Sequence, residues 1–248
     1  MNPVLIKLGP FTIYTYGFFI AAAILMALAF TSLEAKKKGL NPKLTSELGF
    51  YALLGALPGA RLFFVLLNFN YFLKHPVEIL MFWKGGLVFL GGALGATLSS
   101  YFFFKRYKQP LLPWADALAP GIALGQAIGR WGCFFAGCCY GKPTHVPWSI
   151  TFTNPDSLAP LFVPLHPTQI YHSLAGFITF GLLLLGKKWF KKDGQIFALL
   201  LILYAIFRFG IEFLRGDYRG EILFLSATQV IALLVFFLGL FLLLRKKE

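Results

Sequence analysis

Long apolar stretches, separated by short polar segments, run along the whole chain. A helix needs about 20 mostly apolar residues to cross a hydrocarbon core of about 30 Å. The pattern therefore predicts an all-α, polytopic membrane protein with about seven transmembrane helices, built as a single integral membrane domain over residues 1–248. The predicted spans are 11–31, 47–68, 86–104, 115–135, 169–186, 195–214 and 224–244.

The first apolar stretch lies close to the N-terminus, where a cleaved signal peptide is the alternative to a span. No small-residue cleavage site follows this stretch, and Lys7 is the only basic residue before it. We therefore expect the stretch to be retained as a transmembrane helix.

Composition agrees with a membrane protein. Of 248 residues, 58% are hydrophobic and only 13% are charged, whereas a soluble domain has about a quarter charged. The net charge of +13 would also fit a nucleic-acid-binding protein. Most of the basic residues, however, form short clusters between apolar stretches, as in loops that face anionic headgroups. The charge therefore indicates membrane lipids and not nucleic acid as the partner.

The basic residues also predict an orientation, because cytoplasmic loops are enriched in Lys and Arg. Seven spans divide the connecting segments between two sides of the membrane, with many basic residues on one side and few on the other. We expect the N-terminus outside, the C-terminus in the cytoplasm, and the long segment 136–168 outside. The smaller set is Lys7, Lys74, Lys84, Lys142, Arg215 and Arg219. The larger set is Lys36, Lys37, Lys38, Lys43, Lys105, Arg106, Lys108, Lys187, Lys188, Lys191, Lys192, Arg245, Lys246 and Lys247.

Glycines recur at every fourth position inside several predicted spans. Such small-residue stripes allow helix backbones to approach closely in lipid. Close packing is the interpretation that we expect for most of them. The stripes are Gly55 with Gly59, Gly91 with Gly95, and Gly121 with Gly125 and Gly129.

Three arginines, Arg61, Arg130 and Arg208, lie within apolar stretches, and Glu212 follows Arg208 by one helical turn. A charge at the centre of the bilayer costs about 2.5–3.5 kcal/mol on insertion scales, so it usually faces a cavity and has a partner. An anionic ligand would balance the positive excess, and arginine suits phosphate oxygens. Two alternatives stay open: Arg208 and Glu212 as a structural ion pair, and Arg61 reaching the interface.

Other polar residues are weaker candidates. The hydroxyls of Tyr16 and Tyr204 fit either a headgroup contact or a packing role. His166 precedes a span and either lines the cavity or belongs to the helix start, with Thr168 as a capping residue.

The three cysteines, Cys133, Cys138 and Cys139, lie within seven residues and lack the CxxC pair of a common zinc site. No metal site is expected from this spacing. The thiols are either buried apolar groups or, near an arginine, stabilised as thiolate.

Six sequence blocks, in order, resemble the prolipoprotein diacylglyceryl transferase family. The resemblance covers nearly the whole chain, from the first predicted span to the last. The blocks are TYG at 15–17, GARLFFVL at 59–66, WKGGLVFLGG at 83–92, GRWGCFFAG at 129–137 with YG at 140–141, HPTQIY at 166–171, and YAIFRFGIEFLRGD at 204–217.

The resemblance implies a multi-pass enzyme of the bacterial inner membrane that needs no metal or cofactor. Members of this family transfer a diacylglyceryl group from phosphatidylglycerol to the cysteine thiol of a prolipoprotein signal peptide, and glycerol phosphate leaves. The implied partners are therefore phosphatidylglycerol, the signal peptide and membrane lipids. Clustered arginines suit the anionic leaving group, and a thiol nucleophile needs a base or positive potential to form thiolate.

By resemblance, Arg130 binds the headgroup, and Arg208, oriented by Glu212, is the second essential arginine. The predicted catalytic set also contains Tyr16, His166 and Cys138, of which Cys138 occupies a position that is acidic in typical members. The predicted substrate-binding set joins Arg130 with four further residues of the matching blocks, namely Arg61, Gly141, Tyr204 and Arg215.

The chain departs from the family pattern at positions that handle protons. Leu90 stands where typical members have a histidine proposed as base, Cys133 replaces an asparagine, and His172 replaces a glutamate. Three hypotheses follow: an active transferase with another means of forming thiolate, a divergent paralogue using the same lipid with a different acceptor, or a non-catalytic lipid-binding membrane protein.

Overall fold

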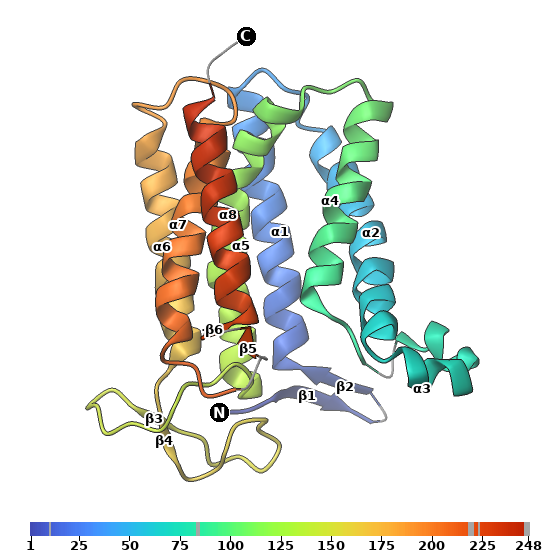
Figure 1. Ribbon diagram of the computed structural model, residues 1–248, viewed down its shortest axis with the longest axis vertical. Coiled ribbons are helices and arrows are strands. Elements are labelled where there is room, and N and C mark those ends of the chain that lie inside the picture. Colours follow the sequence, from blue (N-terminus) through green and yellow to red (C-terminus); the bar gives the residue numbers. More distant parts are fainter. Residues whose placement is uncertain (10, 83–84, 218–220, 223, 246–248) are drawn as a thin grey trace. The chain divides into compact units, whose positions relative to one another are not determined.

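A computed structural model describes residues 1–9, 11–82, 85–217, 221–222 and 224–245 (Figure 1). Four of the basic residues used above to predict orientation, Lys84, Arg219, Lys246 and Lys247, lie outside the described residues. Within the described part the chain has eight α-helices and three short two-stranded sheets. The helices are α1 (Thr15–Lys37), α2 (Leu44–Leu67), α3 (Phe69–Lys74), α4 (Phe89–Arg106), α5 (Leu111–Ala136), α6 (Thr168–Gly186), α7 (Gln195–Glu212) and α8 (Ala227–Leu244).

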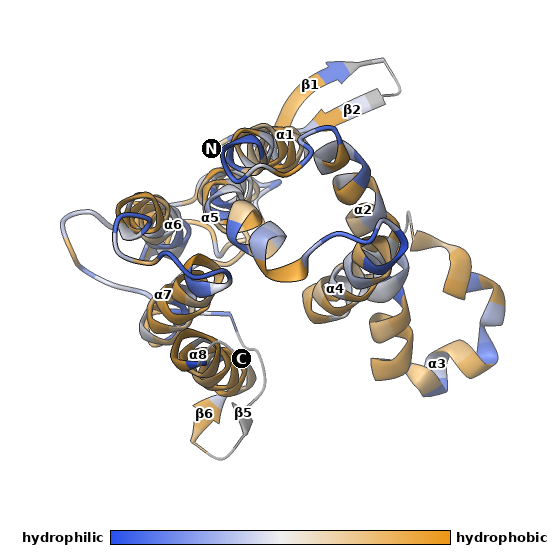
Figure 2. Cartoon of the chain, turned by 90° about the horizontal axis from the view of Figure 1, so that it is seen from above, coloured by the Kyte–Doolittle hydropathy of each residue, from blue (hydrophilic) through white to orange (hydrophobic). Residues whose placement is uncertain are grey.

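The helices confirm the prediction of an all-helical, polytopic membrane protein. Among the described residues, five helices, α1, α2, α6, α7 and α8, are long and apolar enough to cross a bilayer. Many leucines and phenylalanines on these helices are exposed. Helix α8 is coloured as hydrophobic along most of its length in Figure 2. Helices α4 and α5 coincide with the third and fourth predicted spans but have a more polar composition.

The first predicted span begins and ends later than the apolar pattern indicated. Residues 11–14 belong to strand β2 (Phe11–Tyr14), which pairs antiparallel with β1 (Val4–Leu8). All four of these residues are aromatic or β-branched, the types that favour a strand. The helix then continues past residue 31 to Lys37, because its polar end consists of residues that are good helix formers. Gly39, in the left-handed region at φ +72°, ends it.

The chain divides into two compact units, which we describe separately. The first contains residues 1–34 and 115–248 and includes α6, α7 and α8. In this unit α6 packs on α7 and α7 on α8, and the three stand side by side (Figures 1 and 2). Helix α5 lies against both α1 and α6. Gly121 allows the first contact, since a Cβ there would lie 2.6 Å from the Ala27 carbonyl oxygen, and Gly176 allows the second against Ala127.

The second unit contains residues 35–114 and is built on the pair α2 and α4. A Cβ at Gly55 would lie 2.2 Å from the Gly95 carbonyl oxygen, and one at Gly59 would lie 2.5 Å from that of Gly91. No side chain fits between these backbones. The contacts confirm the close-packing interpretation of the glycine stripes. Helix α3 and the 3₁₀ helix η1 (Pro76–Leu80) connect the pair.

Between α5 and α6 the chain runs through a long segment of turns that holds β3 (Ile150–Thr151) and β4 (Pro164–Leu165). Phe152, Ala159 and Leu165 form a small core within it. After α7, β5 (Glu221–Ile222) and β6 (Leu225–Ser226) lead into α8. Ser226 caps α8 by a capping box with Gln229.

Candidate active site

Three helices of the first unit, α5, α6 and α7, enclose a narrow cavity of about 20 Å³. Its polar walls come from Gln126 and Arg130 on α5, His172 on α6, and Tyr204 and Arg208 on α7. The cavity has room for about one water molecule. A lipid headgroup is larger than this space. The cavity thus brings together three residues that the sequence predicted for the site, Arg130, Tyr204 and Arg208.

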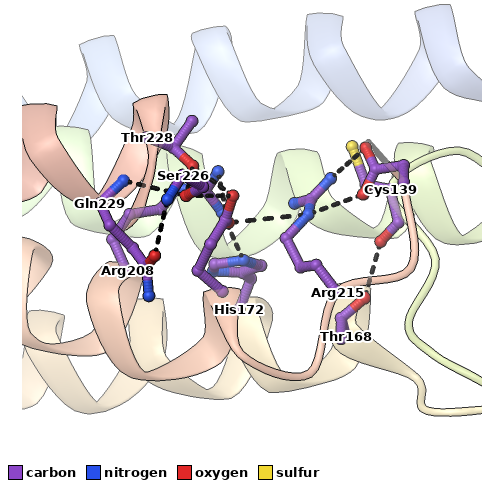
Figure 3. Close-up of polar contacts among 10 residues, drawn as sticks. Cys139, Thr168, His172, Arg208, Arg215, Ser226, Thr228 and Gln229 are labelled. Carbon is purple, nitrogen blue, oxygen red and sulfur yellow. Dashed lines mark hydrogen bonds and ion pairs between the residues drawn. The ribbon is translucent and has the colours of Figure 1, made fainter. Parts of the chain in front are cut away.

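Arg208 is 6% exposed and held at both ends of its guanidinium (Figure 3). Nη2 lies 3.0 Å from Glu212 Oε2, and Nη1 lies 3.0 Å from His172 Nε2. Arginine has only donors, so His172 Nε2 is the acceptor and the imidazole is neutral, with its proton on Nδ1. His172 therefore orients Arg208, and its other ring nitrogen has no lone pair available to accept a proton.

Glu212 is the centre of a buried polar network at the end of α7. Besides Arg208, its carboxylate lies 3.8 Å from Arg215 Nε and accepts hydrogen bonds from the hydroxyls of Ser226 and Thr228. The pair with Arg208 is therefore one link of a network that joins α7 to the start of α8. Ser226 and Thr228 were not among the residues predicted from the sequence. Only the Ser-x-x-Gln capping signature at 226–229 marked that position.

Arg130 differs from the other arginines. No residue in the described part of the chain forms a hydrogen bond or ion pair with its guanidinium, although the residue lines the cavity and is only partly exposed. Its charge acts on His172, on Cys133 one turn along α5, and on Tyr16 of α1. A cation with this placement has the chemistry to bind an anion.

Gly141 lies where three segments meet. Its backbone nitrogen donates to the His166 carbonyl oxygen at 3.1 Å, and the residue also forms a β-bridge with Arg215. A Cβ at Gly141 would lie 2.5 Å from His166 Cβ and 2.9 Å from the Leu214 carbonyl oxygen. Only glycine fits, so its role here is close approach of backbones.

His166 lies outside the walls of the cavity. Its Nδ1 is 3.2 Å from the hydroxyl of Tyr171, which accepts a hydrogen bond from Trp148 Nε1 at 2.7 Å. Thr168 is not the capping residue that was one of our two alternatives, since Pro167 holds the N-cap position. Its hydroxyl instead donates to the Cys139 carbonyl oxygen at 2.7 Å.

Arg215, 5% exposed, forms a two-pronged ion pair with Asp217, with Nε and Nη2 2.8 and 2.7 Å from the two carboxylate oxygens. It also faces Cys139. Hydrogen bonds from the thiols of Cys133 and Cys138, together with the charge of Arg215, lower the pKa of Cys139. That an arginine stabilises a thiolate in this region stays a prediction.

The three cysteine thiols are gathered at the C-terminal end of α5. All three are reduced and partly buried, and their sulfur atoms lie within 4.8 Å of one another. Tyr16 of α1 lies within electrostatic range of all three. The predicted catalytic residues Tyr16 and Cys138 therefore belong to this group, next to the cavity residues and not among them.

Arg61 belongs to the second unit and is 9% exposed. Its guanidinium donates to the backbone carbonyls of Glu78, Ile79, Gly85 and Gly86. It also lies 5.5 and 5.3 Å from the ring centroids of Phe64 and Phe72. With these rings it lines a cavity of about 410 Å³ within the second unit.

The chain is similar to known proteins over nearly its whole length. The sequence profile of the family described as prolipoprotein diacylglyceryl transferase matches residues 3–245. Three similar relatives bear the name phosphatidylglycerol–prolipoprotein diacylglyceryl transferase. The one from Clostridium tetani is 38% identical over 97% of this chain and 96% of its own length. The relative from Trichormus variabilis is 38% identical over 87% of this chain and 79% of its own length. The relative from Synechococcus elongatus is 33% identical over 96% of this chain and 86% of its own length.

Proposed function

Because the chain belongs to the prolipoprotein diacylglyceryl transferase family, we propose that it transfers a diacylglyceryl group from phosphatidylglycerol to the cysteine thiol of a prolipoprotein signal peptide. In this reaction a carbon–sulfur bond forms at the glyceryl carbon, the carbon–oxygen bond to phosphate breaks, and glycerol phosphate leaves. The acceptor thiol loses its proton. The enzyme therefore has to bind an anionic leaving group and favour a thiolate.

The observation that carries the proposal is the contrast between the two cavity arginines. Arg208 is fixed by Glu212 and His172, whereas Arg130 faces the same cavity without a partner among the described residues. A phosphate placed between them would accept hydrogen bonds from Arg130. It would also be attracted by the positive charge of Arg208. As the carbon–oxygen bond breaks, charge grows on the phosphate, and pre-oriented donors stabilise it most at that moment.

The remaining site residues have supporting roles in the proposal. Glu212 holds Arg208 in place, and Tyr204 offers a hydroxyl to the headgroup from the cavity wall. Arg215, Tyr16, His166 and Gly141 surround the place where the thiol would enter, near the cysteines. Neither Leu90, which has no titratable group, nor His172, whose Nε2 already accepts from Arg208, supplies a general base.

For the membrane arrangement we propose seven spans, α1, α2, α4, α5, α6, α7 and α8, within one integral membrane domain of the bacterial inner membrane. The supporting observation is that α4 and α5 add two long helices to the five most apolar ones. An odd number puts the termini on opposite sides, and the loop charges favour the C-terminus inside. Alkaline phosphatase fused after residue 156 should be active and fused after residue 245 inactive. The reverse pattern would contradict the orientation.

Complementation tests the function. In a strain depleted of its own transferase, the wild-type chain should restore growth and lipid-modified lipoprotein, seen as a mobility shift. Arg130→Ala should fail at equal membrane abundance. Lys74→Ala, on the exposed surface of α3, should behave as wild type. If the wild-type chain is inserted normally but modifies no lipoprotein, the different-acceptor alternative replaces this proposal.

A further inference from the structure

All three cysteines of the chain meet at one point, the turn that follows α5. Cys133 lies in the last turn of the helix, and Cys138 and Cys139 follow it. Two residues of this turn have left-handed backbones, Gly137 at φ +76° and Cys139 at φ +61°. For a residue other than glycine this conformation costs about 1–2 kcal/mol, and it persists only where the surroundings impose it.

Contacts from α6 hold the turn in this left-handed conformation. The turn is anchored from α6, where the Thr168 hydroxyl donates to the Cys139 carbonyl oxygen at 2.7 Å and the Gln169 amide donates to that of Cys138 at 2.8 Å. Both side chains are buried, with exposures of 0% and 1%. With their carbonyls held from α6, the two residues keep the thiols on the side of Cys133, and Cys138 Sγ lies 3.8 Å from the Cys133 carbonyl oxygen. The cluster is preorganised by buried hydrogen bonds outside it.

The spacing of the sulfur atoms fits metal coordination. Zinc–sulfur bonds are about 2.3 Å long, so two thiolates on one ion lie about 3.8–4.0 Å apart. The three sulfurs lie within 4.8 Å of one another, so shifts of less than about 1 Å would bring them onto one ion. A disulfide requires about 2.05 Å between two sulfurs and would leave the third thiol out. Three thiolates are a soft ligand set that suits Zn²⁺.

The charges around the cluster also favour an ion with thiolate ligands. Zn²⁺ with three thiolates carries one net negative charge, and a fourth thiolate would add another. Arg215 acts electrostatically on Cys139, and Arg130 acts on Cys133 one turn along the helix. Helical neighbours three residues apart have Cβ atoms about 5–6 Å from each other. The cluster is therefore adjacent to the arginine that receives the phosphate in the function proposed above.

We propose that Cys133, Cys138 and Cys139 bind one Zn²⁺ whose open fourth position takes the acceptor thiol and activates it as a thiolate. The role in activation rests on the proposed function. Sites with three protein ligands and one open position are those in which zinc does chemistry. In this chain the ion would replace the base that Leu90 and His172 do not supply.

The step balances without an oxidant or a further reactant. Binding of the ion releases the protons of the three enzyme thiols, and binding of the acceptor releases its proton to water. The zinc-bound sulfur then attacks the glyceryl carbon with its electron pair, and the carbon–oxygen bond breaks toward the phosphate, which Arg130 and Arg208 bind. The thioether product is a neutral, weaker ligand than a thiolate, so it dissociates and reopens the fourth position.

Metal binding tests the site without reference to activity. The reduced full-length protein in detergent is loaded with Co²⁺ as a spectroscopic probe and with Zn²⁺ for elemental analysis. We expect one ion per chain and a thiolate-to-cobalt charge-transfer band. The triple variant Cys133→Ser, Cys138→Ser, Cys139→Ser should show neither.

A matched control keeps the number of thiols and changes only their arrangement. The double variant Cys133→Ser, Ile128→Cys still has three thiols, but one is displaced along α5 to another face of the helix. It should also lose the charge-transfer band. Wild-type protein without the band, or a triple variant with unchanged stoichiometry, would overturn the site.

Activity tests the role of the ion. Wild-type protein stripped with a chelator should transfer at least about 10²-fold more slowly, as for loss of a proton-handling group, and should recover with Zn²⁺. Arg130→Ala should bind the ion normally yet stay inactive, which separates the metal site from the phosphate site. Full transfer by metal-free protein would overturn activation. Absence of transfer in every sample, with one ion bound, would instead refute the proposed function and leave the metal site standing.

Discussion

The surroundings of Arg61 and Arg208 are two solutions to the same problem, a buried guanidinium inside an apolar helix. Arg61 on α2 donates to four backbone carbonyls of residues 78–86 and stacks against two phenylalanine rings. Arg208 on α7 is held by a carboxylate and an imidazole. The first arrangement surrounds the guanidinium with backbone dipoles. The second neutralises its charge with another side chain.

The different partners of Arg61 and Arg208 indicate different roles. A guanidinium bonded to four carbonyls fixes the course of a backbone segment, so Arg61 shapes the region around η1. A guanidinium in a side-chain network keeps a defined orientation toward the neighbouring cavity. Arg130 has neither kind of partner among the described residues and faces that same cavity. The three arginines therefore differ in whether they serve stability or catalysis.

The largest effect is expected at Arg130. Arg130→Ala should abolish transfer, because the headgroup loses the cavity cation that is left free to bind it. The melting temperature should stay within about 2 °C of wild type, since this guanidinium has no hydrogen-bonded partner to lose among the described residues. Transfer is measured with purified protein in lipid nanodiscs, and unfolding by differential scanning fluorimetry. Arg130→Lys, which keeps charge but not the fork, should recover a small part of the rate. A strongly destabilised Arg130→Ala would show that this arginine is structural, like Arg61.

Arg208→Ala should lose both transfer and stability. It leaves Glu212 buried with only the more distant Arg215 and two hydroxyls, and breaking a buried ion pair costs about 3–5 kcal/mol. Unfolding in denaturant reports the loss. The double variant Arg208→Ala, Glu212→Gln removes the stranded charge and should regain part of the stability but no transfer. Equal stability of Arg208→Ala and wild type would show that the polar network around Glu212 does not stabilise the fold.

Arg61→Ala should loosen the segment that its guanidinium holds. Four carbonyls lose their donor, and a buried group left unsatisfied costs about 1–3 kcal/mol. Limited proteolysis should cut faster within residues 76–82, and Lys74→Ala on the exposed face of α3 serves as the control. Our prediction that Arg61 belongs to the substrate-binding set gains support if transfer falls while the cleavage pattern is unchanged.

The smallest effect is expected at Ser226. Ser226→Ala removes the cap of α8 and one of the two hydroxyls on Glu212, so it should cost about 1 kcal/mol and slow transfer only slightly. Thr97→Ala is the matched control, since the hydroxyl of Thr97 is exposed and donates to the Ala93 carbonyl of its own helix. A loss of transfer as large as that of Arg208→Ala would mean that Ser226 itself contacts the substrate.

Much of the fold could be predicted because lipid imposes a simple rule: long apolar stretches form helices. The predicted spans therefore correspond to helices, and the glycine stripes lie at the contacts they predicted. The N-terminal hairpin was missed because residues 11–14, which include Phe11 and Ile13, continue the apolar stretch of the helix that follows. Hydrophobicity alone does not distinguish a strand from a helix over so short a length.

The site was predictable residue by residue but not as an arrangement. Arg130, Arg208 and Glu212 stood out because charges are rare in apolar stretches. The contact of His172 with Arg208 depends on how α6 packs against α7, which no local pattern encodes.

The cysteine cluster was missed for a related reason. Its spacing lacks a zinc signature, so the sequence alone gave no sign that the three thiols meet. The sulfurs come together only because a left-handed turn, anchored by Thr168 and Gln169, brings Cys138 and Cys139 back to Cys133. Such an anchor depends on tertiary packing and has no signature in the local sequence.

The most direct measurement of the central claim follows both products of one reaction. Purified protein in phosphatidylglycerol nanodiscs is given a synthetic signal peptide with a single cysteine. Mass spectrometry then counts the modified peptide, and an enzymatic assay counts the released glycerol phosphate. We predict equal amounts of the two, none with a thiol-blocked peptide, and none with Arg130→Ala. Transfer by Arg130→Ala at the wild-type rate would contradict the assignment of the unpaired arginine to the phosphate.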